Sequence, residues 1–249
     1  MKKKVALMLI ATMTVFMTSC GSNNDNIGAQ QEQTISENDT SELKTDPQEK
    51  SKFEDISDTE AETGGSNILV AYFSRVGNTE WEDGVDVTTS ASLNVEDGEY
   101  VGNAELLARM AQQVTGGDLF LIETEEAYPS DYRETTDVAT EEQDNDARPA
   151  LASHVENMDS YDTIVLIYPN WWGTLPQPLF TFLEEYDFSG KAILPLCTHE
   201  GSGMGSSERE LAELCPGATL LDGLAVRGSA AASSENEVRA WIENSGILE

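Results

Sequence analysis

Three polar loops in this 249-residue sequence carry residue types that bind phosphate groups and flat aromatic rings. The first loop, "SRVGNT" at 74–79, follows an apolar run and combines two hydroxyls, a glycine turn and one cation. A turn that presents backbone N–H groups beside a helix start can bind phosphate. Neither Gly-Lys-Ser/Thr nor Gly-x-Gly-x-x-Gly is present, so the segment alone also fits an ordinary turn. The candidate contacts are Ser74, Arg75, Val76, Gly77, Asn78 and Thr79.

The second loop lies within "YPNWWGTLP", residues 168–176, and contains two adjacent tryptophans at the end of an apolar run. A planar heteroaromatic compound can stack on such indoles, with backbone amides at its polar edge. The alternative is that one or both indoles pack in the core. For Trp172, the sequence does not favour either interpretation over the other. The candidate contacts are Pro169, Asn170, Trp171, Trp172 and Gly173.

The third loop lies within the glycine-rich segment "THEGSGMGSS", residues 198–207, after another apolar run. Its glycines let the backbone approach a ligand closely. A single histidine in a loop is also compatible with a solvated or structural role. The segment lacks the Gly-x-Ser-x-Gly spacing of a nucleophile turn, and we predict neither a catalytic side chain nor a metal site. The candidate contacts are Thr198, His199, Glu200, Gly201, Ser202 and Gly203.

The elements that must position these loops follow from the hydrophobic pattern. Apolar runs at 68–73, 163–168 and 191–197, with shorter ones in "DLFLIE" and "ATLLDGLAV", indicate strands covered on both faces. A helical stripe spans Asn103–Val114, Pro178 suits a first helical turn, and Ser207 with Glu210 predicts a capping box. This alternation predicts a doubly wound α/β sheet, whose ligand lies beyond the carboxyl ends of the strands.

Taken together, "ILVAYFSRVGNTE", the segment from "YDTIVLIYPNWWG" to "LCPGA", and "GLAVRG" resemble the flavodoxin-like family of bacterial FMN-binding proteins. The resemblance covers nearly all of residues 66–249 in the family's order. It implies a five-stranded parallel sheet in three layers and FMN as the cofactor. Residues 74–79 would then hold the FMN phosphate, and the second and third loops would flank the isoalloxazine ring.

One segment departs from the simplest pattern of that family. The motif Val-Gly-Asn-x-Glu occurs at 76–80 and again at 101–105, and the helical stripe begins only after the second copy. We interpret residues 80–100 as an insertion, expected to be a hairpin, between the phosphate loop and the first helix. The phosphate then needs both copies, which makes Asn103 a further candidate. Alternatively, Thr79 already heads the helix and the insertion is a bulge further along.

Two further segments also lead to expectations. Residues 127–151 form a long polar crossover that either edges the flavin pocket or is a surface excursion. Cys197 and Cys215 end a strand and a returning helix, and we expect them too far apart for a disulfide.

The first 65 residues predict export and attachment. Residues 1–20 read as a signal peptide with a lipobox-like "MTSC", in which Cys20 would carry lipid; an ordinary signal peptide is the alternative. Residues 21–65 predict a disordered acidic tether, and 66–249 the folded domain. We therefore expect a lipid-anchored protein on the extracytoplasmic side of the cell membrane. The formal charge of −32 excludes nucleic acid as a partner.

The leading hypothesis is an FMN-binding redox protein that transfers electrons with a partner protein or a small-molecule donor or acceptor. It is either a carrier or an oxidoreductase, and the lack of a nicotinamide-binding signature favours the carrier. The alternatives are an NAD(P)H- or quinone-linked flavin reductase and a flavin-free surface-binding lipoprotein.

Overall fold

The computed structural model describes residues 67–84 and 91–249. The signal peptide, Cys20 and the tether lie outside these residues, so they stay predictions. Within the part of the chain that is described, no helix is long and apolar enough to cross a membrane.

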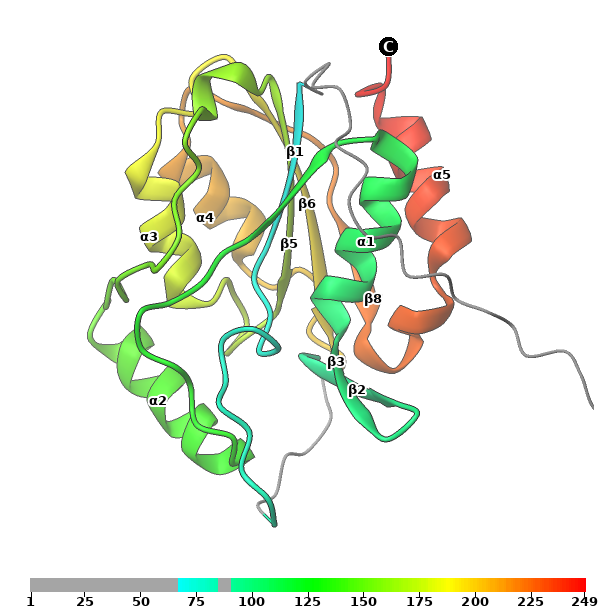
Figure 1. Ribbon diagram of the computed structural model, residues 1–249. Coiled ribbons are helices and arrows are strands. Elements are labelled where there is room, and N and C mark those ends of the chain that lie inside the picture. Colours follow the sequence, from blue (N-terminus) through cyan, green and yellow to red (C-terminus); the bar gives the residue numbers. More distant parts are fainter. Residues whose placement is uncertain (1–66, 85–90) are drawn as a thin grey trace, which may run out of the picture. The chain divides into compact units, whose positions relative to one another are not determined.

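A parallel sheet forms the centre of the domain (Figure 1). Its strands run in the order β4-β1-β5-β6-β7, and β8 also pairs with β6. Every residue of β1 and β5 is buried, as continuous Val/Ile/Leu runs predict for strands covered on both faces. The strands are β1 Ile68–Tyr72, β4 Asp118–Leu121, β5 Thr163–Pro169, β6 Ala192–His199, β7 Thr219–Leu220 and β8 Leu224–Arg227.

The fifth position of the sheet is divided between β7 and β8. Strand β7 pairs with the start of β6, and β8 pairs with its end. Asp222 and Gly223 lie in the interruption, and both are poor strand formers. The predicted five-position, doubly wound parallel sheet is therefore confirmed, with its last strand in two pieces.

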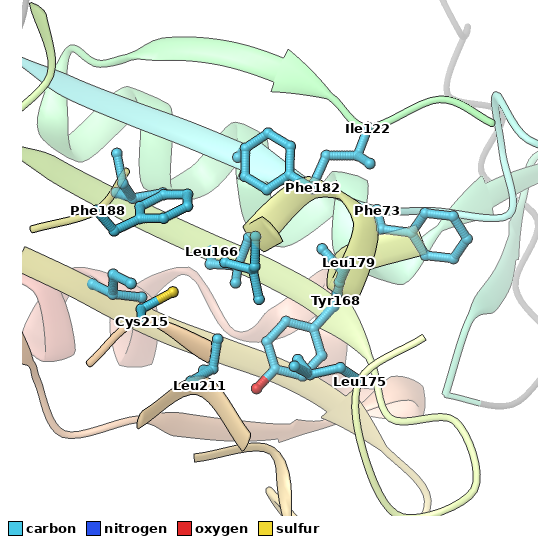
Figure 2. Packing of buried hydrophobic residues seen from close by; sticks show 14 of the residues in the cluster. Phe73, Ile122, Leu166, Tyr168, Leu175, Leu179, Phe182, Phe188, Leu211 and Cys215 are labelled. Atoms are coloured by element: carbon cyan, nitrogen blue, oxygen red, sulfur yellow. The ribbon is translucent and has the colours of Figure 1, made fainter. Parts of the chain in front are cut away.

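Helices cover both faces of the sheet and complete the predicted three layers (Figure 1). Helices α1 (Asn103–Thr115) and α5 (Glu235–Ser245) share one apolar cluster with β1 and β5. Helices α3 (Gln177–Glu185) and α4 (Ser207–Leu214) share the other, where Phe182, Phe188 and Leu211 surround Leu166 (Figure 2). Two 3-10 turns, Met158–Ser160 and Gly228–Ser233, complete the connections.

The predicted hairpin is present between the first loop and α1 (Figure 1). Strand β2 (Leu93–Glu96) pairs antiparallel with β3 (Glu99–Gly102). The turn residues Asp97 and Gly98 have φ of 51° and 87°, the two positive values of a tight hairpin turn. Because β3 ends where α1 begins, the helix starts at Asn103 as its stripe predicted, and the alternative start at Thr79 is wrong.

The polar crossover at 127–151 contains a helix that the sequence analysis did not predict, α2 (Tyr132–Asp144). Asp131 caps it by accepting hydrogen bonds from the N–H groups of Arg133 and Glu134. In Figure 1, α2 and the hairpin lie at the same end of the sheet, on opposite sides of the loop that follows β1.

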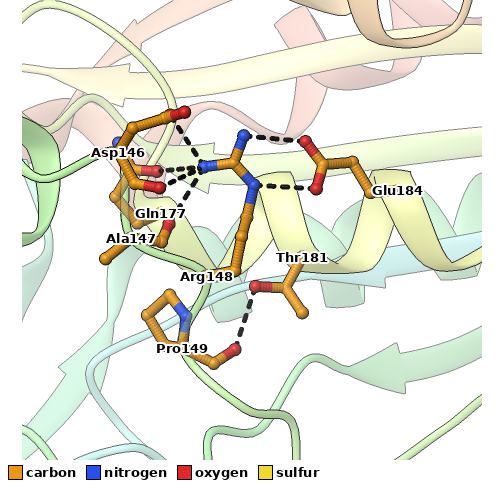
Figure 3. A network of polar contacts seen from close by, with 7 residues as sticks. All are labelled: Asp146, Ala147, Arg148, Pro149, Gln177, Thr181 and Glu184. Atoms are coloured by element: carbon orange, nitrogen blue, oxygen red, sulfur yellow. Dashed lines mark hydrogen bonds and ion pairs between the residues drawn. The ribbon is translucent and has the colours of Figure 1, made fainter.

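A polar network fixes the end of this crossover to α3 (Figure 3). Arg148 donates to both carboxylate oxygens of Glu184, from Nε at 2.8 Å and from Nη2 at 2.7 Å. The hydroxyl of Thr181 donates to the carbonyl of Pro149 at 2.9 Å. The end of the crossover is therefore bonded to α3.

Two smaller expectations have opposite outcomes. Cys197 and Cys215 are free and buried, as expected. The capping box is wrong, because the Ser207 hydroxyl donates backwards to the carbonyl of Met204 at 2.6 Å. Ser206 occupies the N-cap position of α4.

Candidate functional site

The three predicted loops meet at one edge of the sheet. Strands β1, β5 and β6 are parallel neighbours, so their carboxyl ends lie together. Pro169 pairs with Thr198, and β6 continues to His199. These three residues are therefore strand ends and not loop residues as the sequence suggested. The edge is the place where a doubly wound sheet binds its ligand.

Asn78 fixes the shape of the first loop. Its side-chain amide donates to the carbonyls of Ser74 at 2.9 Å and Ile122 at 3.0 Å. Its carbonyl oxygen accepts from the N–H of Thr124 at 2.7 Å and from the hydroxyl at 3.1 Å. The neighbouring Gly77 has φ of 96°, a conformation that favours glycine. The hydrogen bonds of the Asn78 side chain thus hold the first loop against the end of β4.

The two copies of Val-Gly-Asn-x-Glu come together at Ser74. A Cβ atom placed on Gly102, the N-cap residue of α1, would lie 2.0 Å from the Ser74 hydroxyl oxygen. That oxygen also accepts a hydrogen bond from the N–H of Val76 at 3.2 Å. Helix geometry leaves the N–H groups at the start of α1 without partners inside the helix, and they form its positive end. The first loop and the helix start therefore form one corner whose geometry is suited to an anion.

Asn103 supports this corner from the side of the hairpin. Its backbone N–H donates to the carbonyl of Ser92 at 3.0 Å, and its side-chain amide donates to the carbonyl of Ala91 at 3.1 Å. The residue is fully buried. Asn103 thus joins the entry of the hairpin to the helix start.

Buried hydroxyls at the edge fit a ligand rich in oxygen atoms. Among the described residues, the hydroxyls of Thr79 and Thr198 are buried without a hydrogen-bond partner. Such groups are rare in folded proteins, because an unpaired buried polar atom costs free energy. Thr79 belongs to the first loop, and Thr198 is the last residue but one of β6, where it pairs with Pro169. Both positions fit the phosphate and the polar edge of a flavin that the sequence resemblance implied.

Arg75, the predicted cation of the first loop, contacts the segment before α2. Its Nη2 donates to the carbonyls of Pro129 at 2.8 Å and Ser130 at 3.1 Å, and its guanidinium lies 5.3 Å from the Trp81 ring centre. Burial lowers the pKa of Arg75 to about 10, so it stays charged at neutral pH. Arg75 joins the first loop to the α2 crossover.

The two tryptophans of the second loop differ in environment. Trp171 packs edge-on against Phe73 at 5.4 Å and Tyr128 at 5.2 Å, and its indole N–H donates to the Ser92 hydroxyl at 2.9 Å. Trp172 is 58% exposed and has φ of 51°, which is uncommon for a bulky residue. Core packing therefore describes Trp171, whereas the Trp172 ring is available for stacking.

Asn170 joins the second and third loops. Its backbone N–H donates to the carbonyl of Thr198 at 2.7 Å, and its side chain donates to the carbonyl of Gly203 at 3.0 Å and accepts from the N–H of Gly173 at 2.9 Å. Gly205 approaches so closely that a Cβ there would lie 2.0 Å from the Gly173 carbonyl oxygen. The two loops therefore form one connected rim.

The tip of the third loop is held by short-range bonds. The N–H of Gly201 donates to Nδ1 of His199 at 2.8 Å, and the Glu200 carboxylate accepts from the N–H of Ser229 at 3.2 Å. Ser202 is exposed at the tip. The His199 ring thus supports the loop. In residues 67–84 and 91–249, no group of His, Cys, Asp and Glu is arranged to hold a metal ion.

A protein-family model for flavodoxin matches residues 98–245, more than half of the chain. The chain belongs to the flavodoxin family. This membership confirms the resemblance seen in the sequence and supports FMN as the cofactor and a flavin-based redox function. The matched residues begin in the turn of the hairpin, so they include the second and third loops and the start of α1. The first loop lies before them.

Solved structures resemble the chain over a longer span. Proteins of Bacteroides eggerthii and Bacteroides uniformis that are classed as flavoproteins are each 27% identical to it, with TM-scores of 0.55 and 0.53. Each comparison covers 72% of this chain, with 98% and 99% of the respective structure. A Lactobacillus acidophilus flavoprotein in complex with FMN is 18% identical, with a TM-score of 0.45, over 69% of this chain and 99% of its own. No curated protein matches the chain.

Sequence reasoning missed the residues that close the site from the sides. Ala91 contacts Asn103, Ser92 contacts Trp171, and the segment before α2 contacts Arg75. Only Gly102 could have been found from the sequence, because it has the same place in the second Val-Gly-Asn-x-Glu motif as Gly77 has in the first. Nothing in the polar sequence around Ala91 and Ser92 marks them as neighbours of the second loop.

Proposed function

We propose that this chain is a lipid-anchored FMN redox protein that transfers electrons on the outer side of the cytoplasmic membrane. The observation that carries the flavin site is the corner formed by the buried Ser74 hydroxyl and the start of α1 at Gly102. An anionic group gains both a hydroxyl donor and the positive helix end at this corner. The electron carrier is favoured over a self-sufficient reductase because the sequence has no nicotinamide-binding signature.

The first loop and α1 would hold the FMN phosphate. Ser74 and Thr79 contribute hydroxyls, and the backbone N–H groups at the start of α1 contribute the helix dipole. A hydroxyl that donates to a charged phosphate oxygen forms a stronger bond than one that donates to a neutral acceptor. The unpartnered hydroxyl of Thr79 gains a hydrogen bond when a phosphate oxygen reaches it.

The second and third loops would flank the ring system. The exposed Trp172 offers a face for stacking, and the glycine-rich 201–203 segment lets backbone N–H groups approach the polar edge. When bound, FMN supplies the electron-transfer chemistry, and the chain's own residues bind it, orient it and limit its contact with water.

The attachment rests on the first 65 residues. The lipobox-like "MTSC" motivates Cys20 as the lipidated residue, and the acidic, aromatic-poor segment 21–65 is suited to a tether. A flexible chain of this length has a root-mean-square reach of roughly 35–40 Å, enough to hold the domain clear of lipid headgroups. Two acyl chains give stable attachment, where a single chain is marginal.

Titration of the apoprotein with FMN tests the flavin proposal. We expect quenching of FMN fluorescence that ends at one flavin per chain, and a yellow holoprotein that releases FMN on heating. The absence of quenching would contradict the proposal and favour the flavin-free surface-binding alternative. Rapid bleaching of the yellow colour by NADH or NADPH without oxygen would instead favour the reductase.

Substitution Cys20→Ala tests the anchor separately. We expect the variant to leave the membrane fraction or to accumulate as an uncleaved precursor. Membrane extraction and intact mass identical to those of the unmodified chain would refute lipidation at Cys20 and leave the flavin proposal untouched.

A further inference from the structure

The β2–β3 hairpin presents an apolar surface to solvent. Five large apolar side chains are exposed in the described residues, and two of them belong to this hairpin: Val95 at 47% and Tyr100 at 40%. They are paired across the strands, so both side chains lie on the same face. The Trp81 ring, from the segment before the hairpin, packs on the Tyr100 ring with 4.7 Å between the ring centres. Val95, Tyr100 and Trp81 thus form one continuous apolar surface, the hairpin patch.

Acidic residues border the hairpin patch. Each of its three members is next in sequence to at least one exposed glutamate, and these are Glu80, Glu82, Glu96 and Glu99. Residues 80–102 contain seven acidic residues and no lysine, arginine or histidine. None of the four glutamates forms an ion pair with another described residue. The patch is therefore an apolar centre with a negative border that no ion pair balances.

The pair of Glu96 and Glu99 favours a cationic partner. The two residues lie directly opposite each other at the tip of the hairpin. Like charges in this arrangement destabilise a hairpin. The guanidinium of Arg75 lies over the Trp81 ring but is buried, so it offers no cation at the surface. The pair should therefore lower the stability of the free chain, whereas a lysine or arginine of another protein would gain two carboxylate acceptors there.

The hairpin patch lies beside the proposed flavin site but is not part of it. Its three residues belong to none of the three loops. The hairpin lies at the same end of the sheet as the loop that follows β1 (Figure 1), and β3 ends at Gly102, where α1 begins. Gly102 is the residue that meets Ser74 at the phosphate corner. A protein bound to the patch would therefore lie next to the cofactor without occupying its corner.

We propose that the hairpin patch docks a basic partner protein whose surface has an apolar centre surrounded by lysine and arginine. An aromatic centre with a polar rim is the usual anatomy of a protein interface, and complementary charge accelerates the encounter. A second copy of this chain fits poorly, because the two negative borders would repel each other. The inference rests on the proposed function, because it names the class of the redox partner and places it beside the flavin.

Calorimetric titration of the full chain with cytochrome c, a strongly basic redox protein, tests the docking surface. The probe is added to FMN-loaded and to FMN-free chain at about 0.01 M and about 1 M salt, where charges are screened beyond roughly 30 Å and 3 Å. We expect saturable binding to both forms at the lower salt and binding weaker by about ten-fold or more at the higher. No binding to either form at the lower salt would overturn the proposal. Failure of FMN to bind would instead contradict the proposed function, since the FMN-free chain still tests the patch.

The double substitution Glu96→Gln and Glu99→Gln tests the negative border. Its matched control, Glu156→Gln with Glu243→Gln, removes the same charge at two exposed positions outside the hairpin. We expect the hairpin variant to weaken cytochrome c binding by about five-fold or more at the lower salt, and the control by less than about two-fold. Equal weakening by both variants would show that only the total charge of the chain attracts the probe, and the proposal would fail.

Substitution Val95→Ser tests the apolar centre, with Leu248→Ser as the control at an equally exposed position, 47% against 46%. We expect Val95→Ser to weaken cytochrome c binding by about five-fold or more and Leu248→Ser by less than about two-fold, because only the first loses apolar area that the partner buries. Both variants should keep their FMN affinity within about two-fold. Equal effects of the two variants on cytochrome c would overturn the docking surface. Self-association of the unmodified chain that Val95→Ser abolishes would overturn it as well, because the patch would then pair with a second copy.

Discussion

The two Val-Gly-Asn-x-Glu segments have the same motif and adopt different structures. In the first copy, Gly77 has φ of 96° and the chain turns back in a loop. In the second, Gly102 has φ of −73° and the chain enters α1. The motif therefore does not specify a loop or a helix, and the preceding element decides between them: a buried strand in one case and a hairpin in the other.

The asparagines show the same difference at the level of hydrogen bonds. Asn78 bonds to the ends of β1 and β4 through Ser74, Ile122 and Thr124. Asn103 bonds to the entry of the hairpin through Ala91 and Ser92. Each asparagine holds a neighbouring segment in place, and the two glycines bring the backbone close. The corner at Ser74 needs both copies because neither supplies a hydroxyl and a helix start by itself.

The largest expected effect is that of Asn78→Ala on stability. The substitution leaves the carbonyls of Ser74 and Ile122 and the N–H of Thr124 without their partner. Unpaired buried groups of this kind should lower the free energy of unfolding by about 2–4 kcal/mol. Urea denaturation followed by tryptophan fluorescence measures the change. A loss below about 0.5 kcal/mol, the size of an ordinary surface substitution, would show that the first copy does not need its asparagine.

Substitution Gly102→Ala should mainly lower the affinity for FMN. The backbone there tolerates alanine, but the added methyl group meets the Ser74 hydroxyl. Overpacking at such a contact costs about 1–3 kcal/mol, so we expect FMN affinity to fall by roughly ten-fold or more. Combining it with Ser74→Ala removes the clashing oxygen, so the losses in the double variant should be less than additive. Strict additivity would mean that the two copies do not meet.

Substitution Asn103→Ala should have the smallest effect of the three. It removes the hydrogen bond to the Ala91 carbonyl and leaves the backbone bond to Ser92 intact. We expect a loss of about 1 kcal/mol in the free energy of unfolding and a weaker effect on FMN than that of Gly102→Ala. A stability loss equal to that of Asn78→Ala would contradict the difference drawn between the copies.

The sequence predicted the elements whose pattern is strong. Continuous apolar runs located β1, β5 and β6, and the apolar stripe located the start of α1 at Asn103. The loops after these strands followed from topology alone, because the carboxyl ends of neighbouring parallel strands share one edge.

The remaining features depend on contacts that no local pattern records. Helix α2 buries only Thr135 and Ala139, so it has almost no apolar stripe, and the cap at Asp131 was its main signal. The pattern at Ser207 and Glu210 fits a capping box, yet both side chains have other partners. Ser207 accepts from the Tyr168 hydroxyl, and Glu210 accepts from Thr174 and from Ser206, the N-cap residue of the same helix. The distinction between Trp171 and Trp172 likewise required the positions of Phe73 and Tyr128.

The central claim is that the first loop and the helix start together hold the phosphate of FMN. Its most direct test compares FMN with riboflavin, which lacks the phosphate, in Ser74→Ala and Thr79→Ala variants. Ser160→Ala, at the opposite end of the sheet, is the matched control. Loss of a charge-assisted hydrogen bond costs roughly 1.5–3 kcal/mol, so FMN affinity should fall about 10- to 100-fold in both variants. Riboflavin affinity should change less than three-fold, and the control should change neither. Equal losses of FMN and riboflavin affinity in both variants would contradict the account, because the phosphate would then lie elsewhere.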